Sequence, residues 1–341
     1  MEKERIKIFL KHNWSIDAER IIQLPQSTAR CWKIETKNRI YFMKIFQNSF
    51  HESRAVSEYD VCRTLRERGV PVSNIILTNY DQPYILYGTR IVQLQDFEEG
   101  TTPNPNSMSK MMLCEAAEYL GKIHSILKEK ELPMLFDRKW LDKFSETTNI
   151  SFYLETLNLV EKSDISEIQK KKIQNDLVFL IEFTKEMNFL SSYFDHATYT
   201  ASHGDFLHSQ LICNDDRILK IIDFANVHKV PVVLELMRFY WMGSSDCQTP
   251  NLFDIYIFTE YLLSYMKYNH LSKKDIKSMP YIYLYYMGRN RFAYRDYLQT
   301  GDSRSFYESS WRVDVIRYLY QNADNISVKL ACFLGNFGCV E

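Results

Sequence analysis

The chain of 341 residues is long enough for two domains or one two-lobed unit, and its 45% apolar and 25% charged residues are typical of a soluble globular protein without a membrane span. With 42 basic and 43 acidic side chains the net charge is -1, so no overall field favours nucleic acid or an anionic membrane as a partner. Seven scattered cysteines without CxxC spacing, and a charged N-terminus unlike a signal peptide, favour reduced thiols in the cytoplasm.

The first hundred residues predict a small β-rich region with one helix. Cys31–Glu35 and Arg39–Phe46 alternate in strand fashion around a polar Thr36–Asn38 turn, which predicts a hairpin. Apolar residues at three- and four-residue steps then predict a helix from Glu52 to a stop at Gly69. Further strands are expected at 75–77, 84–87 and 89–97.

From Met108 onward the spacing of apolar residues is mostly helical. Together with the β-rich start, this predicts an α+β protein in which a small β lobe precedes a larger helical lobe. The expected helices cover residues 109–127, 139–145, 150–162, 164–192, 232–243, 251–268, 272–297 and 303–335.

A second predicted hairpin carries the residues best suited to chemistry. Two apolar runs, Leu211–Cys213 and Ile218–Ile222, flank a polar turn. Folding the chain back at that turn brings Gln210 within a couple of residues of Asp223, and Asp205 lies in the loop just upstream. Two carboxylates and an amide oxygen thus converge, an arrangement that suits Mg²⁺ when phosphates complete its shell. The alternative is that these are ordinary polar residues of loops and strand ends.

This segment resembles the catalytic segment of the aminoglycoside phosphotransferase and choline kinase group, the small-molecule branch of the protein-kinase-like fold. The shared pattern is His-Gly-Asp, four residues, Asn, a hairpin, and then Asp-Phe or Asp-Trp. The resemblance implies that Asp205 is the base that accepts the proton of the substrate hydroxyl. It implies that Asp223 is the main magnesium ligand, bridging the β- and γ-phosphates. Gln210 replaces the family's Asn as the second metal ligand, with the same amide oxygen on one more methylene.

The resemblance implies an ATP-dependent phosphotransferase that moves the γ-phosphate to a hydroxyl of a small-molecule acceptor, with ATP and Mg²⁺ as cofactors. It implies a bilobal protein-kinase-like fold, with an N-terminal nucleotide-binding lobe over residues 1–97. A mainly helical C-terminal lobe over residues 98–341 would carry the catalytic loop and the acceptor site. The composition, with 23 Tyr and 10 Gly, also resembles the spore-coat-associated kinase-like proteins of endospore-forming bacteria.

A lysine of the small lobe should meet the α- and β-phosphates. Lys44 lies in the apolar strand 41–46, where a buried lysine is costly without an anion to meet it. Simple alternation could instead point it to solvent, but its match to the family's third strand favours the phosphate role. The resemblance implies that Glu58, on the 52–68 helix, pairs with this lysine, with Glu52 as the second choice.

The phosphate loop and the adenine site are less clearly marked. The loop Pro25–Arg30 lacks the family's glycine, so backbone amides and the hydroxyl of Ser27 or Thr28 are expected to reach phosphate. The segment Gln95, Asp96, Phe97 resembles the family's hinge, which implies that its backbone contacts the adenine edge.

Two other readings of the chain remain open. Gln210 and the glycine-free loop favour a weakly active or inactive nucleotide-binding scaffold of the kinase-like type, whereas a protein kinase is disfavoured because no activation-loop pattern follows Asp223. The aromatic helix 281–287 and the cations that follow it are typical of a packed core. They could otherwise form an acceptor pocket, with aromatic faces for a ring and arginines for an anionic group.

Overall fold

The computed structural model describes residues 3–25, 29–291 and 294–336. Contacts within the chain divide it into two compact units, each made of three segments. The first contains Met1–Pro103, Lys122–Leu132 and Ala201–His228, and the second contains Asn104–Gly121, Pro133–Thr200 and Lys229–Glu341. The lobe boundary predicted between residues 97 and 98 stays a prediction.

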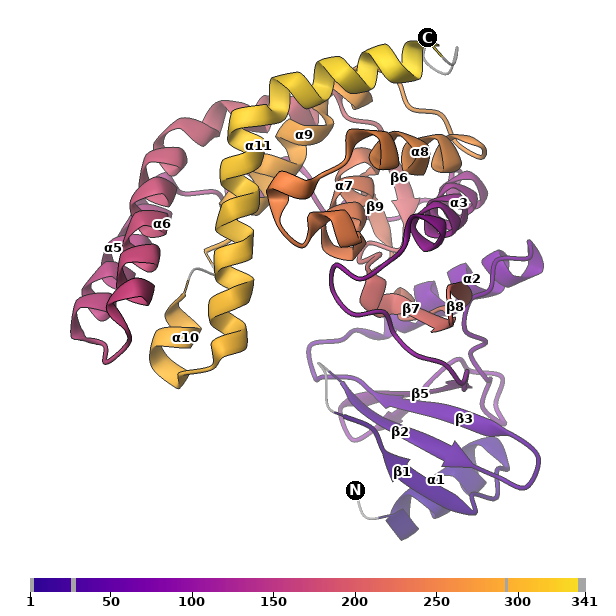
Figure 1. Ribbon diagram of the computed structural model, residues 1–341. Coiled ribbons are helices and arrows are strands. Elements are labelled where there is room, and N and C mark those ends of the chain that lie inside the picture. The colour runs from indigo at the N-terminus through magenta and orange to yellow at the C-terminus, as the bar shows by residue number, and fades with distance from the viewer. Residues whose placement is uncertain (1–2, 26–28, 292–293, 337–341) are drawn as a thin grey trace. The chain divides into compact units, whose positions relative to one another are not determined.

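The first unit is built on an antiparallel five-stranded sheet with the order β1-β2-β3-β5-β4 (Figure 1). The hairpin predicted at residues 31–46 forms β2 and β3, with Cys31 opposite Lys44. The segment 75–77 forms no strand, and only Ile75 makes an isolated bridge to Gln95. The strands are β1 (Arg20–Gln23), β2 (Arg30–Glu35), β3 (Ile40–Ile45), β4 (Ile85–Tyr87) and β5 (Arg90–Asp96).

A helix that sequence reasoning missed, α1 (Lys3–Trp14), covers one face of this sheet. Its buried Ile6 and Leu10 pack in one cluster with Met43 and Ile45 of β3. Because side chains alternate along a strand, Lys44 lies on the opposite face. The charged residues between the apolar positions of α1 weakened its helical signal at the sequence level.

The opposite face of the sheet is covered by α2 (Glu52–Glu67), the helix predicted at 52–68. The Gln93 amide on β5 donates to the Ala55 carbonyl of this helix over 3.4 Å. The helix ends before Gly69, whose φ of +79° lies in the left-handed region that favours glycine. Lys44 therefore lies between the sheet and α2, only 7% exposed.

The second predicted hairpin also belongs to the first unit, as β7 (Leu211–Asn214) and β8 (Arg217–Ile221). It pairs at Cys213 with Thr101, and at Ile221 with Val72. A side chain at Gly100 would place its Cβ 2.6 Å from the Cys213 carbonyl oxygen, so this close approach requires glycine. The hairpin is thereby tied to the segments that flank the sheet.

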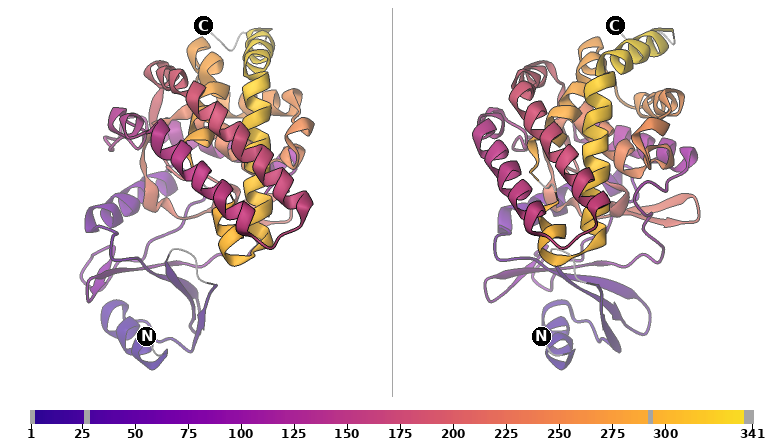
Figure 2. Two further views of the ribbon diagram at one scale, coloured as in Figure 1. Left: turned by 90° about the vertical axis from the view of Figure 1, so that its left-hand side faces the viewer. Right: turned by 60° about the vertical axis from the view of Figure 1, so that its left-hand side comes forward.

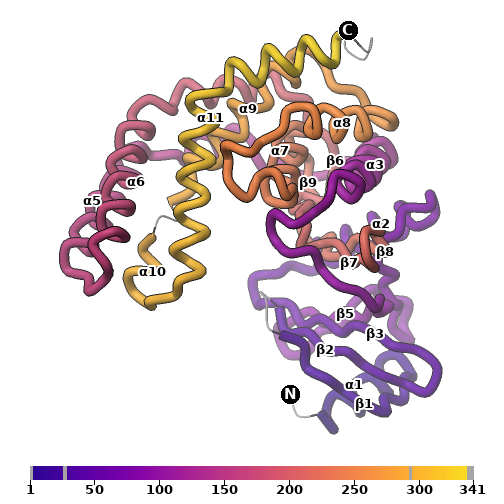
Figure 3. The backbone as a smooth tube through the Cα atoms, in the orientation of Figure 1, coloured from indigo at the N-terminus to yellow at the C-terminus, as the bar shows by residue number. Residues whose placement is uncertain are grey.

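The second unit is mainly helical, as predicted (Figure 3). Several predicted helices are shorter than expected, two of them by many residues at the C-terminal end. The one predicted at 164–192 ends at Glu186 and continues as a 3₁₀ segment, and the one predicted at 272–297 ends at Arg289. The elements are α4 (Arg138–Asp142), α5 (Glu146–Lys162), α6 (Glu167–Glu186), η1 (Met187–His196), α7 (Val232–Gly243), η4 (Ser245–Cys247), η5 (Pro250–Leu252), α8 (Ile255–Met266), α9 (Lys273–Arg289), α10 (Arg295–Thr300) and α11 (Ser303–Asn336).

Helices α5 and α6 run antiparallel beside the first half of α11 (Figures 1 and 2). A buried carboxylate joins α6 to α11: Asp176 on α6 is 1% exposed. It accepts from Lys172 at 2.7 Å, Arg317 of α11 at 3.1 Å and the Tyr294 hydroxyl at 2.5 Å. Three donors satisfy this charge, as a buried carboxylate requires.

Three elements have residues in both units: α3 (Lys110–Leu127) and the paired strands β6 (Tyr199–Ser202) and β9 (His228–Pro231). Neither of these short strands was predicted, since each lacks a clear alternating pattern. Among the described residues, no helix is long and apolar enough to cross a membrane.

Candidate active site

The hairpin holds Gln210 beside Asp223, as its sequence predicts. The Ile222 N–H donates to the Gln210 carbonyl over 2.9 Å, so the residue preceding Asp223 is fixed opposite Gln210. The turn is tighter than expected, with Asp215 and Asp216 between the strands, and Asp215 has a φ of +50°. Aspartate tolerates this left-handed conformation better than most residues.

Asp223 is the partner of Lys44. The Lys44 Nζ lies 2.6 Å from Asp223 Oδ1, and the lysine is almost fully buried. Asp223 itself adopts a left-handed backbone, with φ +63° and ψ +60°. Residues held in this sparsely populated backbone region cluster at functional sites, so the strain at Asp223 makes this segment a candidate functional site.

The ion pair keeps both groups charged. Burial alone would raise the pKa of the Asp223 carboxyl, but the Lys44 charge and hydrogen bond outweigh it, so the pKa is lowered. Burial likewise opposes the charge on Lys44, yet Asp223 and then Glu58 raise the pKa of its ammonium. A carboxylate and an ammonium therefore meet in a poorly hydrated place.

Glu58 is buried in the same region, 1% exposed on α2. Burial raises the pKa of its carboxyl to about 7, although Lys44 acts in the opposite direction and the Phe224 N–H donates to the carboxyl. One of its oxygens, Oε2, has no hydrogen-bond partner among the described residues. Lys44 makes its ion pair with Asp223, and Glu58 acts on Lys44 as a nearby charge.

Sequence reasoning missed Arg54, one turn before Glu58 on α2. Its Nε and Nη2 donate to the Ala225 carbonyl at 3.2 and 2.7 Å, and Nη2 also donates to Asn226 Oδ1. Helix α2 thus binds three consecutive residues after Asp223, through Arg54 and Glu58. Arg54 and Glu58 are four residues apart and so share one face of the helix, and this spacing was the sequence feature that could have predicted a role for Arg54.

His203 connects the loop of Asp205 to the segment of Asp223. Its Nδ1 accepts from the Asp205 N–H over 3.3 Å, so Nε2 carries the proton and donates to the Ile222 carbonyl over 2.9 Å. A second contact is steric, since a Cβ on Gly204 would lie 1.8 Å from the Asn226 carbonyl oxygen. The two motif segments are therefore held together at two points.

The segment predicted as the hinge forms the end of β5. The Asp96 N–H donates to the Asn74 carbonyl and the Phe97 N–H to the Ile40 carbonyl, while Gln95 pairs with Phe42 in the sheet. These two N–H groups are therefore already satisfied within the protein.

The side chain of Asp96 has a structural partner on the hairpin. Lys220 of β8, 7% exposed, donates to Asp96 at 2.8 Å and lies 3.1 Å from Glu98. Ser27, predicted to contact phosphate, lies outside the described residues. A cavity of about 140 Å³ opens beside Lys44 and Asp223. It is lined by Ala29, Lys44, Phe46, Gln47, Ser49, Phe50, Arg54, Asp223, Ala225 and Asn226.

Residues 21–260 match the sequence model of the phosphotransferase enzyme family. The chain belongs to this family. The match covers the sheet, the hairpin and most of the helices, and it confirms the predicted enzyme class, a small-molecule kinase. A search of the curated proteins found no match.

Solved structures share the fold at low sequence identity. An aminoglycoside phosphotransferase from Alicyclobacillus acidocaldarius is 12% identical, with a TM-score of 0.66 over 95% of this chain and 94% of its own. A microcompartment-associated aminopropanol kinase is 12% identical, with a TM-score of 0.61 over 96% and 100%. A spectinomycin phosphotransferase, solved with ADP and spectinomycin, is 13% identical, with a TM-score of 0.60 over 97% and 98%. These likenesses confirm the predicted α+β, protein-kinase-like fold.

Replacing Glu58 with Gln should change how stability depends on pH. The folded carboxyl has a pKa of about 7 against an ordinary value of 4.5, so between these values the native state binds a proton that the unfolded chain releases. Wild-type stability should therefore fall as pH rises from 5 to 7 and then level off. Glu58→Gln has no carboxyl to ionise at this position, so its stability does not fall in this way. At pH 8 the variant should therefore be more stable than the wild type by up to about 3 kcal/mol.

Urea unfolding at pH 5 and pH 8 measures this difference. The exposed Glu67 at the end of the same helix provides the matched control, and Glu67→Gln should show the same offset from wild type at both pH values. An equally constant offset for Glu58→Gln would contradict the assignment of a buried, proton-binding carboxyl.

Gly204→Ala should destabilise the fold far more than Gly69→Ala. Both glycines have a positive φ, of +77° and +79°, but only at Gly204 would the new methyl group overlap a backbone oxygen. The left-handed backbone costs about 1 kcal/mol in both variants, and the overlap adds about 2 kcal/mol or more at Gly204. Thermal unfolding of the two variants measures the difference, and equal losses would show that the loop is not packed against Asn226.

Proposed function

We propose that this kinase moves the γ-phosphate of ATP to a hydroxyl of a small molecule, with Asp205 as the base. Asp223 and Gln210 are proposed to hold Mg²⁺, and Lys44 to meet the phosphates. The observation that carries the proposal is the ion pair between the buried Lys44 and the half-buried Asp223, with an N–O distance of 2.6 Å. It joins two family motifs in a place where burying charge is costly without a function or a strong partner.

The donor set suits magnesium. Asp223 offers an ionised carboxylate and Gln210 an amide oxygen, and Mg²⁺ prefers oxygen ligands in proteins. The described residues contain no group of three or more His, Cys, Asp or Glu side chains that could hold an ion. This favours an ion that takes its remaining ligands from substrate phosphates and water, as Mg²⁺ does in kinases. When bound, Mg²⁺ would neutralise charge that develops on the transferring phosphates.

The backbone contacts of the Asp205 loop support the proposed role of Asp205 in proton transfer. Its backbone N–H is anchored to His203, which is itself anchored to the Ile222 carbonyl, so the loop has one preferred position relative to the metal-binding segment. In the proposed reaction the acceptor hydroxyl loses its proton to the Asp205 carboxylate as its oxygen bonds to the γ-phosphorus. The bond from that phosphorus to the bridging oxygen of ADP breaks, and ADP leaves.

The remaining predicted residues are proposed to bind the nucleotide. Glu58 orients Lys44 electrostatically, because its charge raises the lysine's pKa. The loop that contains Ser27 covers the phosphates. Since the N–H groups of Asp96 and Phe97 are used within the protein, we propose that the adenine takes the carbonyl groups of the segment Gln95, Asp96, Phe97 and the next free N–H downstream.

A weakly active, nucleotide-binding scaffold is the second candidate function. Its specific support is Gln210, which replaces the family's Asn at the proposed second metal ligand. The longer side chain changes the reach of the amide oxygen while leaving its chemistry intact.

Asp223→Asn should abolish the tightening of ATP binding by Mg²⁺. Asparagine tolerates the left-handed backbone at this position, so the local conformation is kept while the carboxylate that would hold the metal is lost, and a melting curve of the variant checks that it is still folded without the charge that faces Lys44. Calorimetric titration with ATP, with and without Mg²⁺, measures the effect, and Asp215→Asn in the turn of the hairpin is the matched control. A variant whose ATP affinity still rises with Mg²⁺ as in the wild type would remove Asp223 from the metal site.

Asp205→Asn distinguishes an active phosphotransferase from a weakly active, nucleotide-binding scaffold. On the enzyme reading it should lower kcat by about 10²–10⁴-fold, the usual contribution of general acid–base catalysis, with nearly unchanged ATP affinity. Consumption of ATP in the presence of hydroxylated metabolites measures kcat. If Asp205→Asn supports growth fully in a cellular assay in which Lys44→Ala fails, the phosphotransferase proposal is wrong and the scaffold stands.

A further inference from the structure

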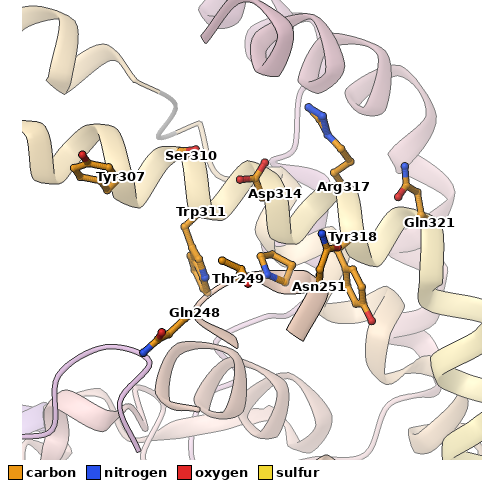
Figure 4. A pocket seen from close by; sticks show the side chains of 11 residues that line it. Gln248, Thr249, Asn251, Tyr307, Ser310, Trp311, Asp314, Arg317, Tyr318 and Gln321 are labelled. Carbon is orange, nitrogen blue, oxygen red and sulfur yellow. The ribbon is translucent and has the colours of Figure 1, made fainter. Parts of the chain in front are cut away.

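A cavity of about 640 Å³ in the second unit has two charged residues in its wall, and both are already paired. Asp314 lies 2.9 Å from Lys172, and Arg317 lies 3.1 Å from Asp176. Figure 4 shows Arg317 directed away from Asn251 on the facing segment. We therefore assign this cavity no ligand.

Arg54 of α2 makes hydrogen bonds to the segment that follows Asp223, and the proposed function gives it no role. Its Nε and Nη2 donate to the Ala225 carbonyl at 3.2 and 2.7 Å, and its Nη2 also donates to Asn226 Oδ1. A planar guanidinium that binds two neighbouring residues fixes their orientation as well as their distance. Arg54 therefore determines the course of the backbone just after the proposed metal ligand.

Two stacked rings hold the side chains of Arg54 and Lys44. The centres of the Phe46 and Phe50 rings lie 3.9 Å apart, with 9° between the ring planes. The Arg54 guanidinium lies 4.9 Å from the centre of the Phe50 ring. The Lys44 Nζ lies 4.6 Å from the centre of the Phe46 ring, and ring faces attract cations at such distances. This aromatic pair, in the wall of the cavity beside Asp223, therefore positions two cations that bind the segment 223–226.

Asn226 extends the contact of Arg54 to the loop that contains Asp205. Its Oδ1 accepts from Arg54, and its carbonyl oxygen lies where a Cβ on Gly204 would come within 1.8 Å. Gly204 directly precedes Asp205, so a shift of Asn226 would displace or release the loop of the proposed base. Arg54 thus contacts the segment of the metal ligand directly and the loop of the base through one residue.

We propose that Arg54 is a positioning residue of the kinase. It fixes residues 223–226, so that Asp223 and the loop of Asp205 keep the geometry that Mg²⁺ binding and proton transfer require. This role rests on the proposed function above. Groups that orient a metal ligand without touching the metal typically change metal affinity or activity by about 10–100-fold. The alternative is that Arg54 only adds stability by tying the first turn of α2 to this segment.

Arg54→Met tests this role by calorimetry on the full chain. The quantity measured is the factor by which Mg²⁺ tightens ATP binding, and this factor should fall about tenfold or more in the variant. Loss of a positive charge would by itself favour a cation bound nearby, so electrostatics alone predicts a change in the opposite direction. A factor that stays the same or rises would overturn the proposal, and a lower melting temperature with an unchanged factor would show a structural arginine.

Arg63→Met is the matched control. Arg63 lies on the exposed face of the same helix, 5.5 Å from the centre of the Tyr59 ring, and pairs with Asp60 at 3.5 Å. Like Arg54, it combines a ring with an oxygen partner, but both of these partners belong to α2 itself. The Mg²⁺ factor should therefore stay at the wild-type level, and an equal fall in both variants would overturn the proposal.

Asn226→Ala removes one acceptor of Arg54 and leaves the Ala225 carbonyl in place. It should lower the Mg²⁺ factor, but less than Arg54→Met does. The double variant should fall no further than Arg54→Met alone, because the Asn226 side chain acts through Arg54, and additive losses would overturn the proposal. If Arg54→Met does not fold, Asn226→Ala alone decides, and an unchanged factor in that variant also overturns the proposal.

Hydrogen exchange of the nucleotide-free protein locates the effect. The N–H groups of Asp205 and Val227 are hydrogen-bonded within this region. In Arg54→Met they should exchange about tenfold or more faster than in the wild type, the equivalent of one hydrogen bond to a charged group. Exchange in β1, on the far edge of the sheet, should not change. Unchanged exchange at Asp205 would overturn the link to the base through Asn226.

The kinase proposal and the positioning role of Arg54 fail in different ways. If Mg²⁺ does not tighten ATP binding in the wild type, the proposed metal site is wrong and the positioning role falls with it. If Mg²⁺ tightens ATP binding equally in the wild type and in Arg54→Met, the kinase proposal stands and the positioning role alone is wrong.

Discussion

The ion pair between the buried Lys44 and the half-buried Asp223 is the interaction on which the arrangement of the first unit depends. It joins strand β3 to the segment after β8, which is 179 residues further along the chain. Lys44 is buried while the Asp223 side chain is 35% exposed, so losing the carboxylate would leave a buried ammonium without its closest counter-charge. The strand register must therefore direct Lys44 toward α2, and the backbone at Asp223 must turn into the left-handed region to meet it.

The other contacts of the site hold that strained backbone in place. Arg54 and Glu58 of α2 bind the residues after Asp223, and His203 binds the residue before it. A strained conformation persists only where surrounding structure determines it from several sides. Here α2, the loop of His203 and the hairpin all contribute contacts, so the backbone near Asp223 is held from several sides.

Local patterns predicted the hairpins, α2 and the pairing of Gln210 with the end of β8, because these depend on residues close in sequence. The partner of Lys44 could not be predicted in the same way. The family resemblance predicted Glu58 as the partner of Lys44, whereas the ion pair of Lys44 is with Asp223. The pKa of about 7 for the Glu58 carboxyl depends on burial by distant segments, which local patterns do not contain. Arg54 was missed for a related reason, since its acceptors are backbone and amide oxygens far along the chain. Helix α1 escaped because its apolar face is narrow and carries charges between the buried positions.

Buried carboxylates of this chain differ in how completely their oxygens are hydrogen-bonded. Asp176 and Asp275 are buried carboxylates that accept from several donors each, as groups that only hold helices together should. Glu58, whose charge acts on Lys44, retains one oxygen, Oε2, without a hydrogen-bond partner among the described residues. Such atoms lower stability, and proteins tolerate them where activity depends on a group that is completed only by a ligand. The unsatisfied oxygen of Glu58 is therefore consistent with the nucleotide site proposed for the first unit.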